Sequence, residues 1–253
     1  MEDKFINFEN SSFYYEPFPH SVINNFLSPD VYDEICNEFP SDEEFVKMKD
    51  KHLGENKFEK FNFSNVGTSK DKFYIYLKKT KSLKFLFEYI NSDKFLRSLN
   101  DFYINNHVDL GINQPKSFKK FLSDIFTKNL NFSFEFSSIP VQNGFIKPHT
   151  DGPNNIIGFV IPIIDNKEIY NFLNLGTKIL KSISNEFKYN NLNRTVPFEK
   201  TELVREMPFE KNCMIMHVKT FNSLHAVGPI QPKLDNSNQK ILRKSITMFL
   251  KRN

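Results

Sequence analysis

The first part of the chain carries hydrophobic residues at helical spacing. Val31, Ile35 and Phe39 lie four residues apart, so they fall on one face of a helix. Ser28 followed by Pro29 favours a helix start, because serine caps free N–H groups and proline suits the first helical turn. A helix is therefore expected from Ser28 to about Phe39.

A second helical pattern runs from Lys81 to Tyr103, and Ser92-Asp93 marks a restart within it. Residues 1–30 form an extended lead-in before the first helix. The N-terminal part, residues 1–130, is thus predicted to be helix-rich.

The spacing changes to that of β-strands after about residue 130. Phe132, Phe134 and Phe136 alternate with polar residues, as expected for a strand with one buried face. Later apolar runs, separated by Pro, Gly, Asn or Asp, are Ile156–Ile164, Cys213–Val218 and Ile246–Leu250. We predict an α+β, mainly β fold class: a two-layer jelly-roll core over residues 131–253, with the N-terminal helices packed outside it.

The composition is that of an ordinary globular protein. At 253 residues and 39% hydrophobic content, the chain suffices for one well-buried domain, residues 1–253. The net charge of +4 comes from dispersed residues, which gives little reason to expect nucleic-acid binding.

The cysteines and the length of the apolar runs indicate in which cellular compartment the protein is expected. Cys36 and Cys213 have no metal-type spacing and are expected to be buried thiols. We find no apolar run long enough to cross a membrane, and no signal-like N-terminus. A reducing cytoplasm without membrane attachment is the expectation.

The segment around His149 and Asp151 is a candidate metal site. Side chains at i and i+2 of a strand point to the same face, so an imidazole and a carboxylate can bind one ion together. The spacing alone is not specific, because His107-Val108-Asp109 repeats it. The latter pair follows Asn105-Asn106 in a turn-like stretch and is expected to be a surface or capping pair.

A facial triad needs a second histidine from another strand. His225 fits because it opens a strand after the loop that follows Cys213–Val218. His217 is the competing candidate, because period two from Ile215 points its side chain to the core side of the strand. Its apolar strand fits a hydrogen-bonded core histidine at least as well as a metal ligand.

Arg243 and Ser245 share a face of the final predicted strand. A guanidinium fork and a hydroxyl on one face can grip a single carboxylate. The alternative is that Arg243 pairs with a surface acidic residue. We favour the carboxylate-binding role because Arg243 and Ser245 follow His-x-Asp and the second histidine in order.

These motifs carry a family resemblance. His149-x-Asp151, then Ser223-x-His225-x-Val227-x-Pro229, then Arg243-x-Ser245 resembles the 2-oxoglutarate and Fe(II)-dependent oxygenase superfamily, particularly its prolyl-hydroxylase-like branch. The resemblance implies a double-stranded β-helix, the cupin-like form of the jelly roll.

The same resemblance implies a chemistry. His149, Asp151 and His225 would hold Fe(II), while Arg243 and Ser245 would bind the far carboxylate of 2-oxoglutarate. With O2 as second co-substrate, the enzyme would hydroxylate an unactivated C–H bond and release succinate and CO2.

The chain departs from the compact members of that family in two stretches. The long segment between the histidines suggests an insertion at about 185–206, and the step to Arg243 implies an extended loop at 231–240. Together with 152–155, these loops are predicted to form the substrate entrance, and Lys147 and Asn154 are the first candidates to contact substrate.

Two alternatives stay open at this point. One is a cupin-like metal-binding or structural protein without oxygenase activity, which has no need of Arg243 and Ser245. The other keeps the iron site but makes the enzyme an epimerase or desaturase. The substrate, whether small molecule or peptidyl, and the oligomeric state are not determined by the sequence.

Overall fold

The computed structural model describes residues 6–47, 60–112, 130–142, 144–234 and 241–252. Within them the chain is mostly β-sheet with some helices, and every strand pairing is antiparallel. None of the helices in this part of the chain is both long and apolar enough to cross a membrane. The predicted mainly β character with added helices is therefore confirmed.

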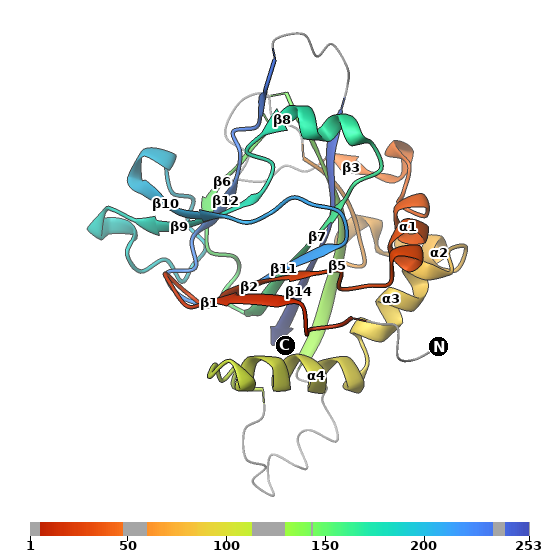
Figure 1. Ribbon diagram of the computed structural model, residues 1–253, viewed down its shortest axis with the longest axis horizontal. Helices are drawn as coiled ribbons and strands as arrows, with labels where there is room; N and C mark the ends of the chain where they lie inside the picture. The colour runs from red at the N-terminus through yellow and green to blue at the C-terminus, as the bar shows by residue number, and fades with distance from the viewer. Residues whose placement is uncertain (1–5, 48–59, 113–129, 143, 235–240, 253) are drawn as a thin grey trace, which may run out of the picture.

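The larger sheet has eight strands, and segments from both ends of the chain contribute to it (Figure 1). In spatial order the strands are β1 (Ser11–Tyr14), β2 (His20–Asn24), β11 (Cys213–Val218), β7 (Asn155–Ile163), β14 (Leu242–Arg252), β5 (Leu130–Pro140), β4 (Phe61–Ser64) and β3 (Val46–Lys47). The longest pairing joins β14 to β5, from Leu242 opposite Pro140 to Arg252 opposite Leu130.

The smaller sheet has four strands. In spatial order they are β10 (Thr201–Glu206), β9 (Thr177–Ser182), β12 (His225–Val227) and β6 (Ile146–His149). A separate two-stranded ribbon is formed by β8 (Phe172–Leu173) and β13 (Gln231–Pro232). Ile179 of the smaller sheet packs in one buried cluster with Val22 and Ile215 of the larger, so the two sheets lie against each other.

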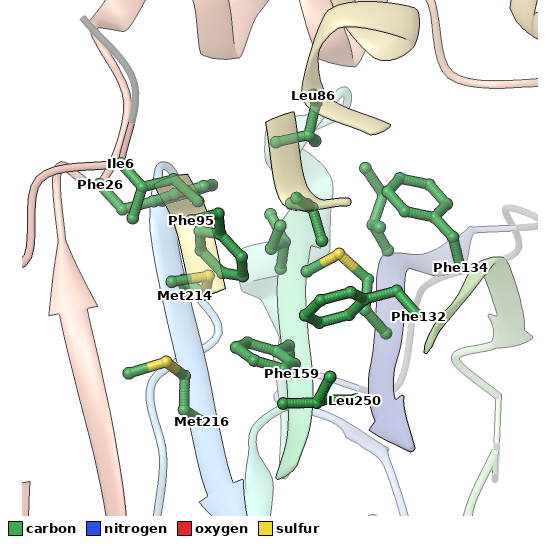
Figure 2. Packing of buried hydrophobic residues seen from close by; sticks show 14 of the residues in the cluster. Ile6, Phe26, Leu86, Phe95, Phe132, Phe134, Phe159, Met214, Met216 and Leu250 are labelled. Carbon is green, nitrogen blue, oxygen red and sulfur yellow. The ribbon is translucent and has the colours of Figure 1, made fainter. Parts of the chain in front are cut away.

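The helices cover the other face of the larger sheet. They are α1 (Pro29–Asn37), α2 (Lys70–Leu77), α3 (Ser82–Ile90) and α4 (Asp93–Asn105). Figure 2 shows Leu86 of α3 and Phe95 of α4 packed over apolar side chains of the strands, among them Phe132 and Phe159. The Phe95 ring centroid lies 5.8 Å from that of Phe132 and 6.2 Å from that of Phe159. Because side chains alternate along a strand, the residues between these apolar ones point to the other face of the larger sheet, toward the smaller sheet.

Helix boundaries follow the local signals. Ser28 is the N-cap of α1, which ends at Asn37, slightly before the expected Phe39. The restart at Ser92 is confirmed, because its hydroxyl accepts a hydrogen bond from the Phe95 N–H at the start of α4. Short 3₁₀ turns also occur: η2 (Asp42–Glu44), η4 (Gly67–Ser69), η5 (Lys167–Asn171), η6 (Asn185–Phe187) and η7 (Phe198–Lys200).

The N-terminal part holds all four described α-helices, but it also contributes strands that the sequence patterns did not identify. The lead-in contains β1 and β2, and β2 pairs directly with β11. Cys213 is buried as expected, whereas Cys36 is only half-buried, although its neighbour Ile35 on α1 is fully buried.

Candidate metal centre

Three potential metal ligands meet on the smaller sheet and the loop that follows one of its strands. His149 ends β6, Asp151 lies two residues beyond it, and His225 begins the neighbouring strand β12 directly opposite His149. One donor atom from each residue lies within 4.8 Å of the others. The strand pairing, which the sequence does not specify, brings together residues that are far apart in the chain.

Both histidines are fixed with the same ring nitrogen facing the centre. Nδ1 of His149 donates to the Lys147 carbonyl at 2.8 Å, and Nδ1 of His225 donates to the Ser223 carbonyl at 3.0 Å. This tautomer leaves Nε2 of each ring with a lone pair. Burial, which outweighs the attraction of Asp151, holds the pKa of His225 well below its usual range, so that ring is neutral.

Asp151 completes the group from a left-handed backbone conformation. Its φ is 65°, which aspartate tolerates better than most residues, and it is 6% exposed. Burial raises its pKa, but the three imidazoles around the carboxylate together outweigh burial and hold the pKa well below the usual range. His225 has the largest effect among them, and His217 contributes a hydrogen bond to Oδ2. The carboxylate is therefore ionised.

The donor set fits a divalent transition metal. Nε2 of His149 lies 3.4 Å from Asp151 Oδ1, and Nε2 of His225 lies 3.5 Å from Asp151 Oδ2. Two lone pairs and an anionic oxygen converging in a buried space repel one another unless a cation lies between them. Two imidazoles and one carboxylate on one side of such an ion form the facial triad typical of non-haem Fe(II) centres.

His217 lies next to this group without belonging to it. Its Nε2 is 3.0 Å from Asp151 Oδ2 and donates a hydrogen bond, since the carboxylate can only accept. The side chain is 2% exposed and lies across from Gly158 in the β11–β7 pairing. A Cβ at residue 158 would lie 2.4 Å from the His217 ring, so glycine provides the space for that ring. The sequence left open whether His217 is a core histidine or a metal ligand. In the structure it is a buried histidine that hydrogen-bonds to the Asp151 carboxylate.

A cavity of about 390 Å³ opens beside the three residues, between the two sheets. Arg243 and Ser245 of β14 line it together with His149, Asp151 and His225. The structure thus brings all five of these sequence-predicted residues to one cavity.

Arg243 is a buried cation at this cavity. It is 3% exposed, its Nε donates to the Leu175 carbonyl at 2.7 Å, and its guanidinium lies 4.5 Å from the Phe209 ring centroid. Burial lowers its pKa to about 10, and Glu206 partly offsets this. Within the described part of the chain no carboxylate lies within ion-pair distance of Arg243, so its remaining N–H groups are suited to an anionic ligand.

The other sequence candidates lie elsewhere. His107 and Asp109 are exposed, which confirms them as surface residues, and the Asp109 carboxylate accepts a hydrogen bond from the Gly111 N–H in the turn that follows α4. Lys147 and Asn154 are not among the cavity-lining residues, whereas Gly152 and Asn155 are. Residues 235–240 of the expected loop lie outside the described residues.

The cavity also has lining residues that the sequence reasoning missed. Thr247, Phe249 and Lys251 continue the period-two face of β14 that begins with Arg243, so the strand pattern contained this signal. Glu135 of β5 and Asn193 of the segment 185–206 also line the cavity. No local sequence pattern indicated that Asn193 would line the cavity.

The sequence matches no protein-family model, and no curated protein sequence matches significantly. Solved structures resemble the chain at a distance. They include a prolyl-4-hydroxylase from Pseudomonas putida, with 12% identity, 92% of each chain covered and a TM-score of 0.44. The non-haem α-ketoglutarate-dependent epimerase SnoN of nogalamycin biosynthesis has 9% identity, 92% of this chain and 78% of that chain covered, and a TM-score of 0.49.

A viral collagen prolyl hydroxylase from Paramecium bursaria Chlorella virus 1, in its 2-oxoglutarate complex, has 11% identity. The alignment covers 92% of this chain and 96% of that chain, with a TM-score of 0.41. Because these likenesses are distant, the chemistry of the chain has to follow from its own residues.

Proposed function

We propose that the chain is an Fe(II)- and 2-oxoglutarate-dependent dioxygenase that hydroxylates an unactivated C–H bond. The observation that carries the proposal is the meeting of two sites in one cavity: the group His149, Asp151 and His225, and the buried cation Arg243. A metal site alone fits many proteins. A metal site that shares a cavity with an arginine lacking an acidic partner fits an enzyme whose co-substrate is a dicarboxylate.

The fold suits this function. The two packed antiparallel sheets are interpreted as a double-stranded β-helix within a single domain of residues 1–253, with residues 1–130 supporting a jelly-roll core at 131–253. Ligands on β6, β12 and the loop after β6 are then held by a rigid sheet, which keeps their geometry fixed when substrate enters.

His149, Asp151 and His225 would hold the Fe(II). When bound, the iron supplies the redox chemistry that couples O2 reduction to decarboxylation of 2-oxoglutarate and to oxidation of the substrate. The backbone carbonyls of Lys147 and Ser223 fix both imidazole rings, and His217 fixes the carboxylate. These residues keep the donor atoms in place.

Arg243, with Ser245 beside it on the same strand face, would bind the far carboxylate of 2-oxoglutarate. A carboxylate inside a barrel costs several kcal/mol if unpaired, and the guanidinium offers it charge-assisted hydrogen bonds. The Leu175 carbonyl and the Phe209 ring orient Arg243 toward this task.

The substrate would enter past the segments 152–155, 185–206 and 231–234, of which the first two contribute Gly152, Asn155 and Asn193 to the cavity lining. Lys147 and Asn154 lie next to this lining and stay candidates for contact with a substrate larger than the cavity. We propose a small-molecule or peptidyl substrate and a cytoplasmic location.

The test is formation of succinate from 2-oxoglutarate by the purified protein. We expect turnover that requires added Fe(II) and is lost in His149→Ala and His225→Ala, whereas His107→Ala behaves as the wild type. Metal affinity should fall in the same two variants. Wild-type iron affinity and succinate formation in both ligand variants would refute the assignment. Tight iron binding without succinate formation would favour a cupin-like metal-binding protein, which does not require the buried Arg243.

A further inference from the structure

Besides Arg243 and the ion-paired Lys60, the cavity contains a third cationic side chain whose purpose the metal and 2-oxoglutarate do not explain. Lys251 lines the cavity from the far end of β14 and is half-buried. Among the described residues no carboxylate lies within ion-pair distance of it and no hydrogen-bond acceptor contacts it; the ammonium lies 5.5 Å from the Phe249 ring centroid. Burial lowers the pKa of Lys251, and Glu135 and Asp151 partly offset this.

Lys251 is too far from Arg243 to serve the same ligand. The two residues are eight positions apart on one strand, or about 26 Å at about 3.3 Å per residue. The end carbons of 2-oxoglutarate are separated by four bonds of about 1.5 Å each, or at most about 6 Å. A co-substrate that binds Arg243 therefore does not reach Lys251, which lies at the other end of β14, where it pairs with Asn155.

The charges of the loaded cavity balance except at Lys251. The metal dication and the co-substrate dianion cancel, and so do Asp151 and Arg243. Lys60 lies 2.9 Å from Glu135, and these two charges also cancel. The remaining charge is that of Lys251, and a cation in a partly desolvated cavity favours an anionic ligand.

We propose that Lys251 binds a carboxylate on the substrate that is oxidised. This proposal rests on the oxygenase function proposed above and names the substrate class. The one uncompensated ammonium suits a singly charged carboxylate better than a doubly charged phosphate, because a second negative charge would have no cation to balance it. The carboxylate belongs either to a small organic acid or to the C-terminus of a peptide.

Asn193 is a second, independent indication that the cavity takes a polar substrate. Its Oδ1 is buried, faces no hydrogen-bond donor among the described residues, and belongs to a residue that lines the cavity. The backbone there has a φ of 56°, a conformation that asparagine tolerates. A buried acceptor without a donor is costly, so an N–H or O–H group of the substrate is its natural partner.

The carboxylate site can be tested before the substrate is known. The protein is loaded with Zn(II) and 2-oxoglutarate, its lysines are ¹³C-dimethylated, and acetate is titrated while the methyl resonances are recorded by NMR. The Lys251 resonance is assigned by its absence in Lys251→Arg. We expect a saturable shift at Lys251 with a midpoint below about 100 mM acetate, because a charge-assisted hydrogen bond contributes a few kcal/mol at most. Acetamide should cause no such shift, and exposed Lys79 should not respond.

Equal responses of Lys251 and Lys79 to acetate, or equal responses of Lys251 to acetate and acetamide, would overturn the proposal. This readout does not depend on turnover. If the wild type makes no succinate while Lys251 binds acetate, the oxygenase function fails and the anion site stands.

Activity then identifies the source of the carboxylate. Succinate formation is compared for free amino acids and their carboxamides, and for tripeptides with free and amidated C-termini. Stimulation only by the free amino acids, or only by the free-carboxylate tripeptides, supports the proposal and identifies the source. Stimulation by the carboxamides to the same extent contradicts it. Lys251→Met should lower kcat/KM for the stimulating acid at least tenfold relative to its amide, whereas Lys79→Met should keep the wild-type ratio. If no compound stimulates, the acetate titration decides.

Discussion

His217 donates a hydrogen bond to Asp151 over 3.0 Å, from a strand that pairs with neither of the strands carrying His149 and His225. The bond holds one oxygen of the proposed metal-binding carboxylate, so that Asp151 keeps a fixed orientation toward His149 and His225. The larger sheet thus supports the proposed metal site, whose three residues lie on and beside the smaller sheet.

Removing this hydrogen bond is expected to weaken metal binding without removing a ligand. Partners of ligating residues typically change metal affinity by about 10- to 100-fold. His217→Leu should therefore lower Fe(II) affinity about tenfold or more, as measured by competition with a chelator. His217→Gln retains a donor and should recover part of the loss.

Gly158→Ala tests the hydrogen bond between His217 and Asp151 by a substitution on the neighbouring strand. The added Cβ would collide with the His217 ring, displacing it from Asp151. Its effect on Fe(II) affinity should match that of His217→Leu, and the double variant should lose no more than either single one. Additive losses would show that the two residues act separately. His107→Gln serves as the histidine control.

Arg243→Ala is expected to weaken 2-oxoglutarate binding about a hundredfold while leaving Fe(II) affinity nearly unchanged. The loss of charge-assisted hydrogen bonds to one carboxylate corresponds to about 3 kcal/mol. Both affinities are to be measured in the wild type, in Arg243→Ala and in Arg252→Ala, whose side chain is exposed. Equal losses of 2-oxoglutarate affinity in the two variants, or no loss in either, would disprove the role of Arg243.

Cys213 should make the protein less stable at alkaline pH. Burial raises the pKa of its thiol from 9.0 to about 12, so above pH 9 the unfolded chain loses a proton that the folded chain keeps. The unfolded state then binds fewer protons, and the free energy of unfolding falls as pH rises, by up to about 1.4 kcal/mol per pH unit until about pH 12.

Urea unfolding of the wild type and Cys213→Ala between pH 7 and 10.5 measures this contribution. The two curves of unfolding free energy against pH should converge above pH 9. A constant difference across the range would show that the thiol does not titrate differently in the two states.

Phe95→Ala should destabilise the fold by about 3–5 kcal/mol, as expected for loss of a fully buried aromatic side chain. The ring joins α4 to the outer face of the larger sheet through Phe132 and Phe159 (Figure 2). Denaturant midpoints of Phe95→Ala and of Ile75→Ala, whose side chain is 55% exposed, provide the comparison. A loss below 1 kcal/mol would mean that α4 is not essential to this packing.

The sequence by itself determined features that depend on near neighbours in the chain. The helix start at Ser92 follows from capping by its hydroxyl, and the start of α1 follows from Pro29 in its first turn, since the Ser28 side chain makes no capping hydrogen bond. The strand character of residues 132–136 follows from alternation. Period two along the final strand places Arg243 and Ser245 on one face. These interactions span a few residues, so the local pattern contains them.

Only the tertiary structure decided how distant segments meet. The pairing of β12 with β6 places His225 opposite His149, and the pairing of β11 with β7 places His217 over Gly158. Strand order and register depend on packing of the whole chain, and many registers are compatible with the same apolar runs. For that reason the pattern could not separate His217 from a core histidine. Period two places Lys251 on the same face of the strand as Arg243, but only the packing of the two sheets shows that this face lines a cavity.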